Sequence, residues 1–356
     1  MRFREANRRY EEWLERQTVV LPEDLRLKHA RMREGLFPFL RATYFRWAQV
    51  WREVCGKDAA GPKVLAVGDL HVENFGTWRD VDGRPVWGVN DFDEVHPLPF
   101  ANDLIRLAVS AYLAIGEGEL SFAPKLASQA ILEGYEAALR AGGCPFVLAD
   151  SSTPLREMAR KRLDTPERFW NKLRRFAPLR KPPPTEVMRL IRELLPEKNL
   201  PLHFVHRIAG LGSLGKQRFT AVGVWAGGQI AREAKALTPS ACLWAEGKPE
   251  AEEVRYEEIL RRAVRCPDPL VAVRGKWLLR RLSPDCFRIV LADLPRVRDD
   301  RELLYSMGWE TANVHLGSGK AVDIRKDLKR RKANWLHRAA KAMREEVFRD
   351  WNEFRG

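Results

Sequence analysis

Residues 67–76 read Val-Gly-Asp-Leu-His-Val-Glu-Asn-Phe-Gly, and residues 89–94 read Val-Asn-Asp-Phe-Asp-Glu. Asp69 follows a short apolar run, Asn74 comes five residues later, and Asp91 ends a second apolar run. In kinase-type phosphoryl transfer, one carboxylate accepts the proton of the attacking hydroxyl, while an amide and a second carboxylate hold the metal ions that bridge the phosphates. The two motifs therefore predict a phosphoryl-transfer site.

A β-hairpin is predicted over residues 74–91, with its turn at residues 80–85. Because a hairpin returns its far end to the place it left, we expect Asp91 beside Asn74. Their oxygen atoms suit Mg²⁺, which prefers hard oxygen ligands and keeps waters and substrate phosphates as its other ligands. Asp93 is a second candidate metal carboxylate, and an ordinary surface charge is the alternative for it.

Asp69 and His71 are the candidate catalytic residues, in the loop after a strand predicted over residues 63–68. Polar groups in such a loop are costly unless they are used or hydrogen-bonded. The structural alternative is a capped turn in which Asp69 bonds to backbone amides. The combination with Asn74 and Asp91 favours the catalytic interpretation.

A glycine-rich segment at residues 207–219 reads Arg-Ile-Ala-Gly-Leu-Gly-Ser-Leu-Gly-Lys-Gln-Arg-Phe. In a dinucleotide-binding unit, such a segment joins a strand to a helix. Here the following residues alternate in hydrophobicity and end at a Gly-Gly turn, which predicts a strand and a hairpin instead. A strand, a glycine loop and a strand form the phosphate cover of a kinase. The residues expected to contact nucleotide phosphates are Gly210, Gly212, Ser213, Leu214 and Gly215.

The next predicted strand, residues 229–234, stands where the third strand of a kinase carries its phosphate-binding lysine. This chain offers Arg232 there, which pairs with phosphate as a planar fork and not as a point charge. Lys235 is the alternative. A helix predicted over residues 249–265 carries the acidic partners for this cation, and the choice among them stays open: Glu252, Glu253, Glu257 and Glu258.

The loop and the hairpin resemble the aminoglycoside phosphotransferase and choline kinase branch of the protein-kinase-like superfamily. That branch has a Gly-Asp-x-His-x-x-Asn loop, then an apolar pair and an Asp-aromatic-acid triplet. The resemblance implies a general base for Asp69, metal ligands for Asn74 and Asp91, and a structural buttress behind the loop for Asp103. The alternative for Asp103 is an ordinary acid favoured at a helix N-terminus.

The chain also resembles, over roughly residues 30–320, a bacterial family known as domain of unknown function 2252. Two residues depart from its usual pattern: Ala42 replaces a Gly, and Arg232 replaces a Lys. Arg41 is expected to support the site structurally. The family name carries no activity, so the resemblance supports the site residues and not a reaction. The shared marks are Phe37, Phe39 to Arg41, Gly68 to Gly76, Asn90 to Glu94, Asp103 to Leu107, Gly210 to Gly215, Glu233, Ala234, Gly308, Trp309 and His315.

The order of these motifs predicts an α+β, two-lobed protein-kinase-like fold that is circularly permuted. In ordinary kinases the glycine-rich lobe precedes the catalytic loop, whereas here it follows. We expect a helical lobe with the catalytic loop and the metal-binding hairpin at residues 1–185, a small antiparallel β-lobe at 186–290, and helices that return to the helical lobe at 291–356. Termini that lie near each other at the surface make such a permutation tolerable.

Hydrophobic periodicity and turn residues give the individual elements. Helices are predicted over residues 4–17, 26–56, 98–115, 122–141, 155–176, 249–265, 300–316 and 323–354. Strands in the second half are predicted over residues 203–209, 217–225, 229–234, 270–274 and 276–282, after a linker at 178–184.

The chain of 356 residues has a net charge of +14, and its basic residues are concentrated in two blocks at 156–192 and 325–344. Such blocks suit nucleotide phosphates, nucleic acid or an acidic membrane surface, and a solvated basic face is the alternative. Five cysteines without CxxC spacing and an N-terminus without a signal-peptide core predict a cytoplasmic protein. No apolar run approaches the length of a membrane span, so none is expected.

These observations favour an ATP- and Mg²⁺-dependent phosphotransferase, with Mn²⁺ as an alternative ion, that acts on a hydroxyl of a small molecule or protein. The acceptor is left open, because acceptor pockets lie on variable loops and helices. Two other functions remain: a catalytically weak nucleotide-binding regulator, for which Arg232 is the best argument, and a basic nucleic-acid-binding protein.

Overall fold

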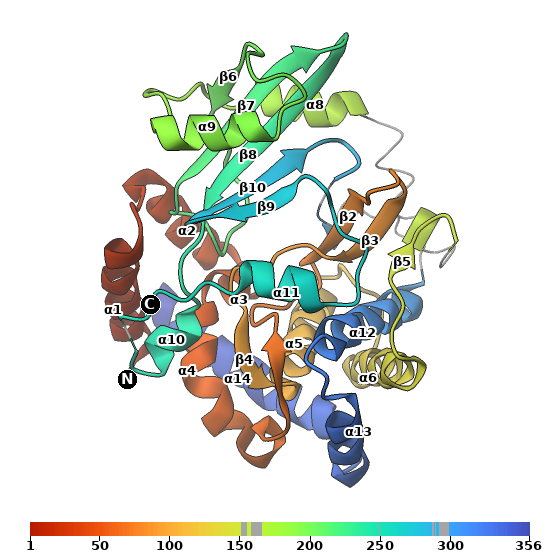
Figure 1. The fold of residues 1–356 in the computed structure, drawn as a ribbon. Coiled ribbons are helices and arrows are strands. Elements are labelled where there is room, and N and C mark those ends of the chain that lie inside the picture. Colours follow the sequence, from red (N-terminus) through yellow and green to blue (C-terminus); the bar gives the residue numbers. More distant parts are fainter. Residues whose placement is uncertain (151–154, 158–165, 249, 287, 289, 292–298) are drawn as a thin grey trace.

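The computed structural model describes residues 1–150, 155–157, 166–248, 250–286, 288, 290–291 and 299–356. The fold is α+β, as predicted: half of the chain is helical, and the strands form small antiparallel sheets. In Figure 1 the largest sheet lies above a body of helices, and a smaller hairpin sheet lies at one side between them.

The largest sheet has five antiparallel strands in the order β6-β7-β8-β10-β9. They are β6 (His203–Val205), β7 (Arg218–Trp225), β8 (Gly228–Ala236), β9 (Val271–Arg274) and β10 (Trp277–Leu282). The strands predicted for this region are confirmed, although β6 ends at Val205 and not at residue 209. Residues 206–217 therefore form a long loop between β6 and β7, and this loop contains the glycine-rich segment.

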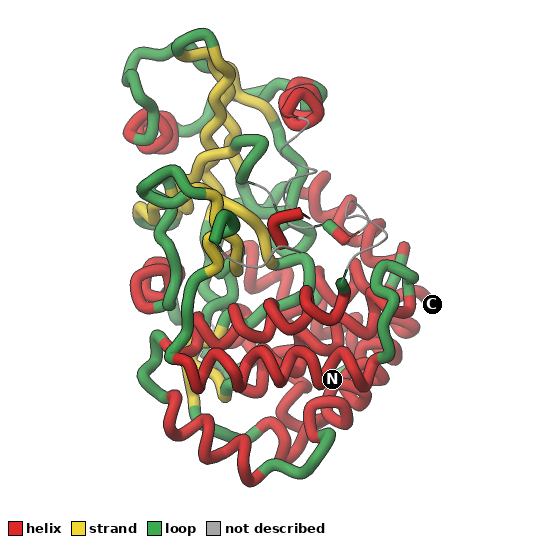
Figure 2. Tube along the Cα trace, turned by 90° about the vertical axis from the view of Figure 1, so that its right-hand side faces the viewer, coloured by secondary structure: helices red, strands yellow, loops and turns green. Residues whose placement is uncertain are grey.

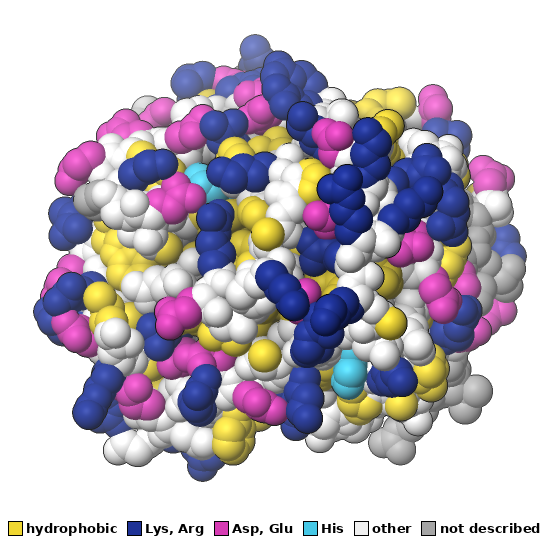
Figure 3. Space-filling model, turned by 90° about the horizontal axis from the view of Figure 1, so that it is seen from below, with side chains coloured by type: hydrophobic (Ala, Val, Ile, Leu, Met, Phe, Trp, Pro, Cys, Tyr) yellow, Lys and Arg dark blue, Asp and Glu magenta, His cyan; other side chains and the backbone are white. Residues whose placement is uncertain are grey.

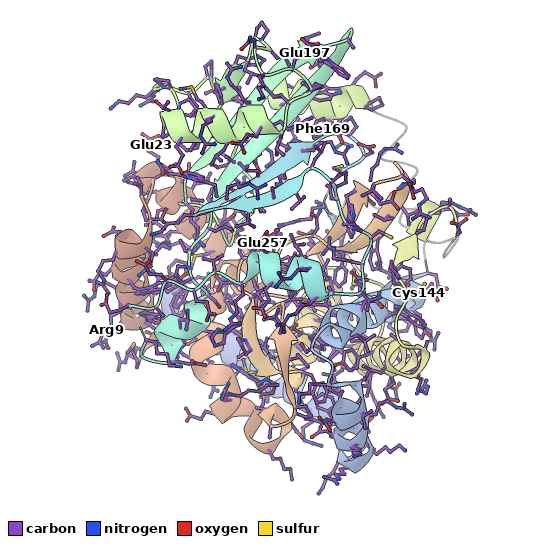
Figure 4. All side chains as sticks on the ribbon, in the orientation of Figure 1. Arg9, Glu23, Cys144, Phe169, Glu197 and Glu257 are labelled. Atoms are coloured by element: carbon purple, nitrogen blue, oxygen red, sulfur yellow. The ribbon has the colours of Figure 1, made fainter. Side chains whose placement is uncertain are left out.

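Successive side chains of a strand point to opposite faces of the sheet, and both faces of this sheet carry apolar side chains. One face packs against α9 (Thr185–Glu193), which contributes Val187, Leu190 and Ile191. The opposite face packs against α8 (Pro166–Arg174), where Phe169 is labelled in Figure 4. The β7–β8 hairpin is thus covered by a helix on each face.

The helical body is built around α5 (Ala101–Gly116), in which residues 101–114 are all buried. A helix that is buried on all sides needs neighbours on all sides. Contacts with α5 come from α6 (Pro124–Ala141), α12 (Asp300–Leu316) and α14 (Trp335–Arg355). Figure 2 shows helices packed side by side below the strands.

The other elements frame this core. The N-terminal helices are α1 (Phe3–Gln17), α2 (Pro22–Glu34), α3 (Leu36–Ala42) and α4 (Tyr44–Cys55), followed by a 3-10 turn, η1 (Gly56–Ala59). The shorter helices later in the chain are α10 (Ala241–Ala245), α11 (Tyr256–Arg262) and α13 (Ala321–Arg330). The small sheets pair β1 (Lys63–Ala66) with β4 (His96–Pro99), and β2 (Phe75–Arg79) with β3 (Pro85–Val89) and β5 (Phe146–Val147).

The two ends of the chain lie together on the helical body (Figure 1). The Phe3 amide donates a hydrogen bond to Glu353 Oε2 at 3.1 Å, and the rings of Phe3 and Phe354 are 5.6 Å apart. The first and last helices are therefore neighbours.

Several predicted boundaries were wrong, for local reasons. The helix expected over 26–56 is three helices, because the chain is extended at Gly35 and leaves the helical conformation at Thr43. The helix expected over 323–354 is two, separated by a bend with Asn334 in the left-handed conformation. The helix expected over 249–265 is shortened to α11, and α9, α10, β4 and β5 were not predicted. Of the helix expected over 155–176, residues 158–165 lie outside the described residues.

No helix in the described ranges is both long and apolar enough to cross a membrane. The cysteines are free thiols, and Cys55 and Cys242 are buried.

Candidate phosphoryl-transfer site

The loop that carries Asp69 is fixed by a glycine. Strand β1 leads into Gly68, whose φ of +81° is rarely adopted by other residues. A Cβ at this position would lie 2.3 Å from the carbonyl oxygen of Glu94 and 2.8 Å from the hydroxyl of Tyr44. The loop therefore packs directly on the second acidic motif, and only glycine allows this approach.

Asp103, at the start of α5, lies behind the loop and holds it. Its carboxylate accepts hydrogen bonds from the backbone amides of Val67, at 2.7 Å, and Gly68, at 3.0 Å. His315 on α12 lies 2.9 Å from the same carboxylate, and the hydroxyl of Tyr135 lies 2.8 Å from the other nitrogen of His315. A buried chain of hydrogen bonds thus runs from α6 through α12 to the Asp69 loop.

Arg106 orients the carboxylate of Asp69. Its Nε donates to Asp69 Oδ1 at 2.8 Å, and a second nitrogen contacts the same oxygen. The guanidinium is fully buried and lies over the rings of Tyr44 and Trp47, at 4.9 and 4.8 Å from their centroids. Burial raises the pKa of Asp69 above its ordinary value, and the Arg106 charge opposes this rise. Asp69 is therefore a fixed carboxylate whose second oxygen does not share the Arg106 contact.

The predicted hairpin is confirmed, and it brings Asn74 and Asp91 together. Phe75 pairs with Val89, and Asn74 Nδ2 donates to the backbone oxygens of Asp69, at 3.0 Å, and Asp91, at 3.2 Å. With its amide nitrogen used in this way, Asn74 Oδ1 is buried and has no hydrogen-bond partner among the described residues. A buried oxygen without a donor is costly and is ready to accept a ligand.

Two cations hold the carboxylate of Asp91. Lys235 Nζ on β8 lies 3.2 Å from Asp91 Oδ1 and 2.6 Å from Asp93 Oδ1, and Arg288 donates to Asp91 Oδ2 at 2.9 Å. Burial alone would raise the pKa of Asp91, but the Lys235 and Arg288 charges hold it well below its ordinary value. The two cations therefore favour the ionised form of Asp91.

These residues fit a divalent ion with oxygen ligands. The free Oδ1 of Asn74 and the ionised Asp91 are the donors that Mg²⁺ prefers. Within the described residues, no three His, Cys, Asp or Glu side chains cluster as a metal site. In this structure Lys235 and Arg288 form ion pairs with the Asp91 carboxylate. A metal ion would have to bind beside these two cations or displace them.

The glycine-rich loop lies over Asp69. A Cβ at Gly212 would be 3.4 Å from Asp69 Oδ2 and 3.1 Å from the carbonyl oxygen of Arg41. Gly210 and Gly215 adopt left-handed φ values of +73° and +104°. The two motifs, which are more than 130 residues apart in the sequence, thus meet in space.

The other residues of this loop are engaged with protein groups. Ser213 Oγ donates to the Gly210 carbonyl oxygen at 3.3 Å and accepts from Arg218 at 3.0 Å. Leu214 is buried. Ser213 faces the cavity described below, whereas Leu214 contributes to packing.

The two candidate cations on β8, Arg232 and Lys235, are three residues apart, so their side chains lie on opposite faces of the sheet. Lys235 faces the Asp91 side, whereas Arg232 faces α9 and donates to the carbonyl oxygen of Leu194 at 2.8 Å. The structure thus brings the alternative, Lys235, to the site and does not bring Arg232 there. On the Lys235 side, the buried Glu233 pairs with three arginines: Arg207, Arg218 and Arg280.

The acidic residues near α11 do not pair with Arg232 in the described part of the chain. Glu253 and Glu258 pair with Arg255 instead. Glu257 lies on α11, which Figure 4 shows between the sheet and the helical body. The expected Glu–Arg232 pair is therefore absent among the described residues, because Arg232 lies on the other face of the sheet.

His71 and Arg41 line the same cavity. His71 Nδ1 accepts from the Glu73 amide at 3.2 Å, which places the ring proton on Nε2. Burial, together with the Arg41 and Arg288 charges, lowers the pKa of His71 well below its ordinary value, so the ring is neutral. Arg41 pairs with the carboxylate of Glu73, and its Nε has no hydrogen-bond partner among the described residues.

The cavity has a volume of about 40 Å³. A cavity of this size holds a few waters or a small anion, whereas pockets for drug-sized ligands measure roughly 300–1,000 Å³. It joins the two motifs, the glycine-rich loop and the N-terminal helices. Its lining includes Tyr10, Lys28, Arg41, Asp69, His71, Asn74, Asp91, Asp93, Glu94, Gly210, Gly212, Ser213, Lys216 and Arg288.

Several residues of this site were not assigned a role from the sequence. Arg106 and Asp103 are the two charged residues of the largely apolar helix α5, and a charge in such a helix is a signal of a buried partner. Lys28, Glu94, Lys216 and Arg288 carry no comparable signal, because they reach the cavity only through packing between distant segments.

Residues 19–146 match the model of a family described as an uncharacterized protein conserved in bacteria (domain of unknown function 2252). The match contains both acidic motifs and Asp103, and it supports the predicted resemblance over this part of the chain. The glycine-rich loop and Lys235 lie beyond it. No curated protein and no solved structure gives a significant match.

Proposed function

We propose that this protein is an ATP- and Mg²⁺-dependent phosphotransferase that acts on a hydroxyl group. The observation that carries the proposal is the convergence of Asp69, Asn74 and Asp91 beneath Gly212. A fixed carboxylate, an amide oxygen without a donor, an ionised carboxylate and a close glycine backbone are the parts that kinase-type transfer uses.

In this proposal Asp69 accepts the proton of the acceptor hydroxyl. The acceptor oxygen forms a bond to the γ-phosphorus of ATP, the bond from that phosphorus to the β–γ bridging oxygen breaks, and ADP leaves. Arg106 holds one oxygen of Asp69 and leaves the other near the glycine-rich loop. The raised pKa of Asp69 makes it a better proton acceptor than an ordinary aspartate.

Asn74 Oδ1 and Asp91 would hold Mg²⁺, which supplies charge neutralisation for the phosphates. Asp93 is the neighbouring carboxylate, and Mn²⁺ suits the same oxygen ligands. Lys235 and Arg288 are the cations close enough to turn from Asp91 to a phosphate group.

The proposed fold is a circularly permuted, kinase-like one. Support comes from the adjacent termini and from the five-stranded sheet, which lies in the middle of the chain and carries both the glycine-rich loop and Lys235. A cavity of about 40 Å³ is too small for a nucleotide, so the proposal requires the sheet and the helical body to move apart when a nucleotide binds.

A nucleotide-binding regulator is the second candidate. The observation that favours it is that every carboxylate of the metal site already has a cation: Lys235 for Asp93, and both Lys235 and Arg288 for Asp91. The third candidate, nucleic-acid binding, has less support. On the face in Figure 3, Lys and Arg are interspersed with Asp and Glu and do not form one continuous basic surface.

Release of ADP from Mg²⁺-ATP separates the enzyme from the regulator, and it needs no identified acceptor because water or the protein itself can accept the phosphoryl group. We expect slow ADP release by the wild type and a decrease of about 10²–10⁴-fold in Asp69→Asn. Asp82→Asn, in the exposed hairpin turn, is the matched control. Equal rates in the wild type and Asp69→Asn would overturn the enzyme, and Mg²⁺-ATP binding without turnover would establish the regulator.

A further inference from the structure

Lys28 on α2 is a buried cation without a partner. Its side chain lines the cavity, and the residue is only 5% exposed. It makes no hydrogen bond or ion pair with any described residue. Burial lowers the pKa of Lys28 to about 8; the Glu11 charge opposes this effect, and the neighbouring Lys216 charge adds to it. A buried, unpaired ammonium is costly, so its presence beside a cavity points to a ligand of opposite charge.

Two further donors line the same cavity. Lys216, in the glycine-rich loop, is 5% exposed, and its ammonium contacts the hydroxyl of Thr238 at 2.7 Å. Tyr10 on α1 is buried with its ring stacked on Phe45, and its hydroxyl has no hydrogen-bond partner in the described part of the chain. Two ammonium groups and a phenol therefore face this space.

The other charges around the cavity are mostly matched. Asp69 pairs with Arg106, and Arg288 with Asp91. Among the carboxylates, Glu11 acts most strongly on the charge of Lys28, and Glu94 follows. Glu11 already pairs with His29 at 2.6 Å, and Glu94 accepts from the Ala241 amide, at 2.7 Å, and the Ser240 hydroxyl. These carboxylates thus have donors of their own, whereas the Lys28 ammonium makes no hydrogen bond or ion pair with a described residue.

The packing of α2 against the glycine-rich loop holds the two lysines near each other. The Leu21 amide donates to the carbonyl oxygen of Gly215 at 2.8 Å, and Asp24 lies 2.9 Å from the ring nitrogen of His206. These contacts between α2 and the loop before β7 therefore hold Lys28 and Lys216 in their positions beside the cavity.

We propose that Lys28, Lys216 and Tyr10 form a subsite for an oxyanion, a phosphate or carboxylate group, of the substrate that carries the reacting hydroxyl. The inference that an oxyanion binds here depends only on these three residues. The inference that this oxyanion belongs to the acceptor rests on the proposed phosphotransferase function. Asp69 lines the same cavity, so an acceptor anchored by its anion presents its hydroxyl to that carboxylate. A cationic acceptor, such as an aminoglycoside or choline, would be repelled by the two ammonium groups.

The test uses the full chain and measures its melting temperature with inorganic phosphate, with acetate, and with sodium chloride at equal ionic strength. The variants are Lys28→Met and Lys216→Met, with the exposed Lys326→Met as the control. We expect phosphate to raise the melting temperature of the wild type and of Lys326→Met, and to lose this effect in both cavity variants. Lys28→Met should also melt at a higher temperature than the wild type without ligand, because it removes a buried unpaired charge.

A response to acetate as well as phosphate would assign the subsite to oxyanions in general, and a response to phosphate alone would assign it to a phosphoryl-bearing acceptor. A full phosphate effect in Lys28→Met, or none beyond that of sodium chloride in the wild type, would overturn the subsite. Mg²⁺-ATP is measured in parallel: if it stabilises no variant while phosphate acts through Lys28, the anion site stands and the proposed function fails.

Discussion

Gly212 lies against Asp69: a Cβ at Gly212 would be 3.4 Å from Asp69 Oδ2. This approach joins the loop between β6 and β7 to the loop after β1, and it places the sheet over the helical body at the acidic motifs. The same Cβ would be 3.1 Å from the carbonyl oxygen of Arg41, so the approach leaves no room for a branched side chain. Substitutions at Gly212 therefore test both the packing of the sheet on the helical body and the candidate site.

Gly212→Ala should weaken Mg²⁺-ATP binding more than it lowers the melting temperature. Its φ is not left-handed, so one methyl group costs little backbone strain, but it occupies the space above Asp69 that phosphates would use. Gly212→Val should also lower the free energy of unfolding, by about 1–3 kcal/mol, because its extra methyl groups overpack against Arg41. Nucleotide affinity and melting temperature are measured together, with Gly228→Ala as the control. Unchanged affinity in Gly212→Ala would show that the loop only turns the chain.

Lys235→Met should make the protein depend on Mg²⁺ for stability. The change leaves Asp93 without its cation and Asp91 with Arg288 alone, which costs about 3–5 kcal/mol for a buried pair. A divalent ion bound by Asn74 Oδ1 and Asp91 would restore part of that loss. Urea unfolding with and without Mg²⁺ measures the effect, and Arg232→Met, on the other face of β8, is the matched variant. If Mg²⁺ stabilises Lys235→Met no more than Arg232→Met, these carboxylates do not bind the ion.

Asp103→Asn should destabilise the protein by about 3–5 kcal/mol, because it breaks a buried network that includes two backbone amides and His315. Glu133→Gln, which removes an exposed ion pair with Arg301, should cost less than about 1 kcal/mol. Chemical denaturation compares the two variants. Similar small losses in both would mean that Asp103 does not hold the Asp69 loop in place.

Glu310 gives a prediction about pH. This residue accepts a hydrogen bond from the Val89 amide, and burial raises its pKa from 4.5 to about 7. The folded protein thus binds a proton that the unfolded chain has released between these values, so Glu310 contributes stability below pH 4.5 that is lost as the pH rises through 7. Glu310→Gln should flatten the pH dependence of the free energy of unfolding between these values. An unchanged slope would show that Glu310 is ionised in the folded protein.

The parts of the site that could be predicted from the sequence are those fixed by local geometry. The hairpin from Asn74 to Asp91 was predicted from two segments of alternating apolar residues joined by a turn. The α+β class was predicted from the order of segments with helical and strand periodicity of hydrophobic residues. The breaks at Gly35 and Thr43 were missed because the apolar pattern continues across them.

The choice between Arg232 and Lys235 depended on which face of β8 turns toward Asp91. Strand alternation separates the two residues, but the register against β10 and the position of α9 decide the face, and neither is a local property. Lys28 and Lys216 meet only because α2 packs on the glycine-rich loop. Pairs brought together by such packing leave no signal in either segment alone.

The most direct test of the account is the effect of Mg²⁺-ATP on the melting temperature of the wild type and of Asp91→Asn. Asparagine keeps the size of Asp91 and removes the charge that would hold the ion, while Lys235 keeps Asp93 as a partner. We predict that Mg²⁺-ATP raises the melting temperature of the wild type and of Asp82→Asn by several degrees, more than ATP or Mg²⁺ alone, and that Asp91→Asn loses this rise. A full Mg²⁺-ATP effect in Asp91→Asn, or none in the wild type, would contradict the assignment of this site to phosphoryl transfer.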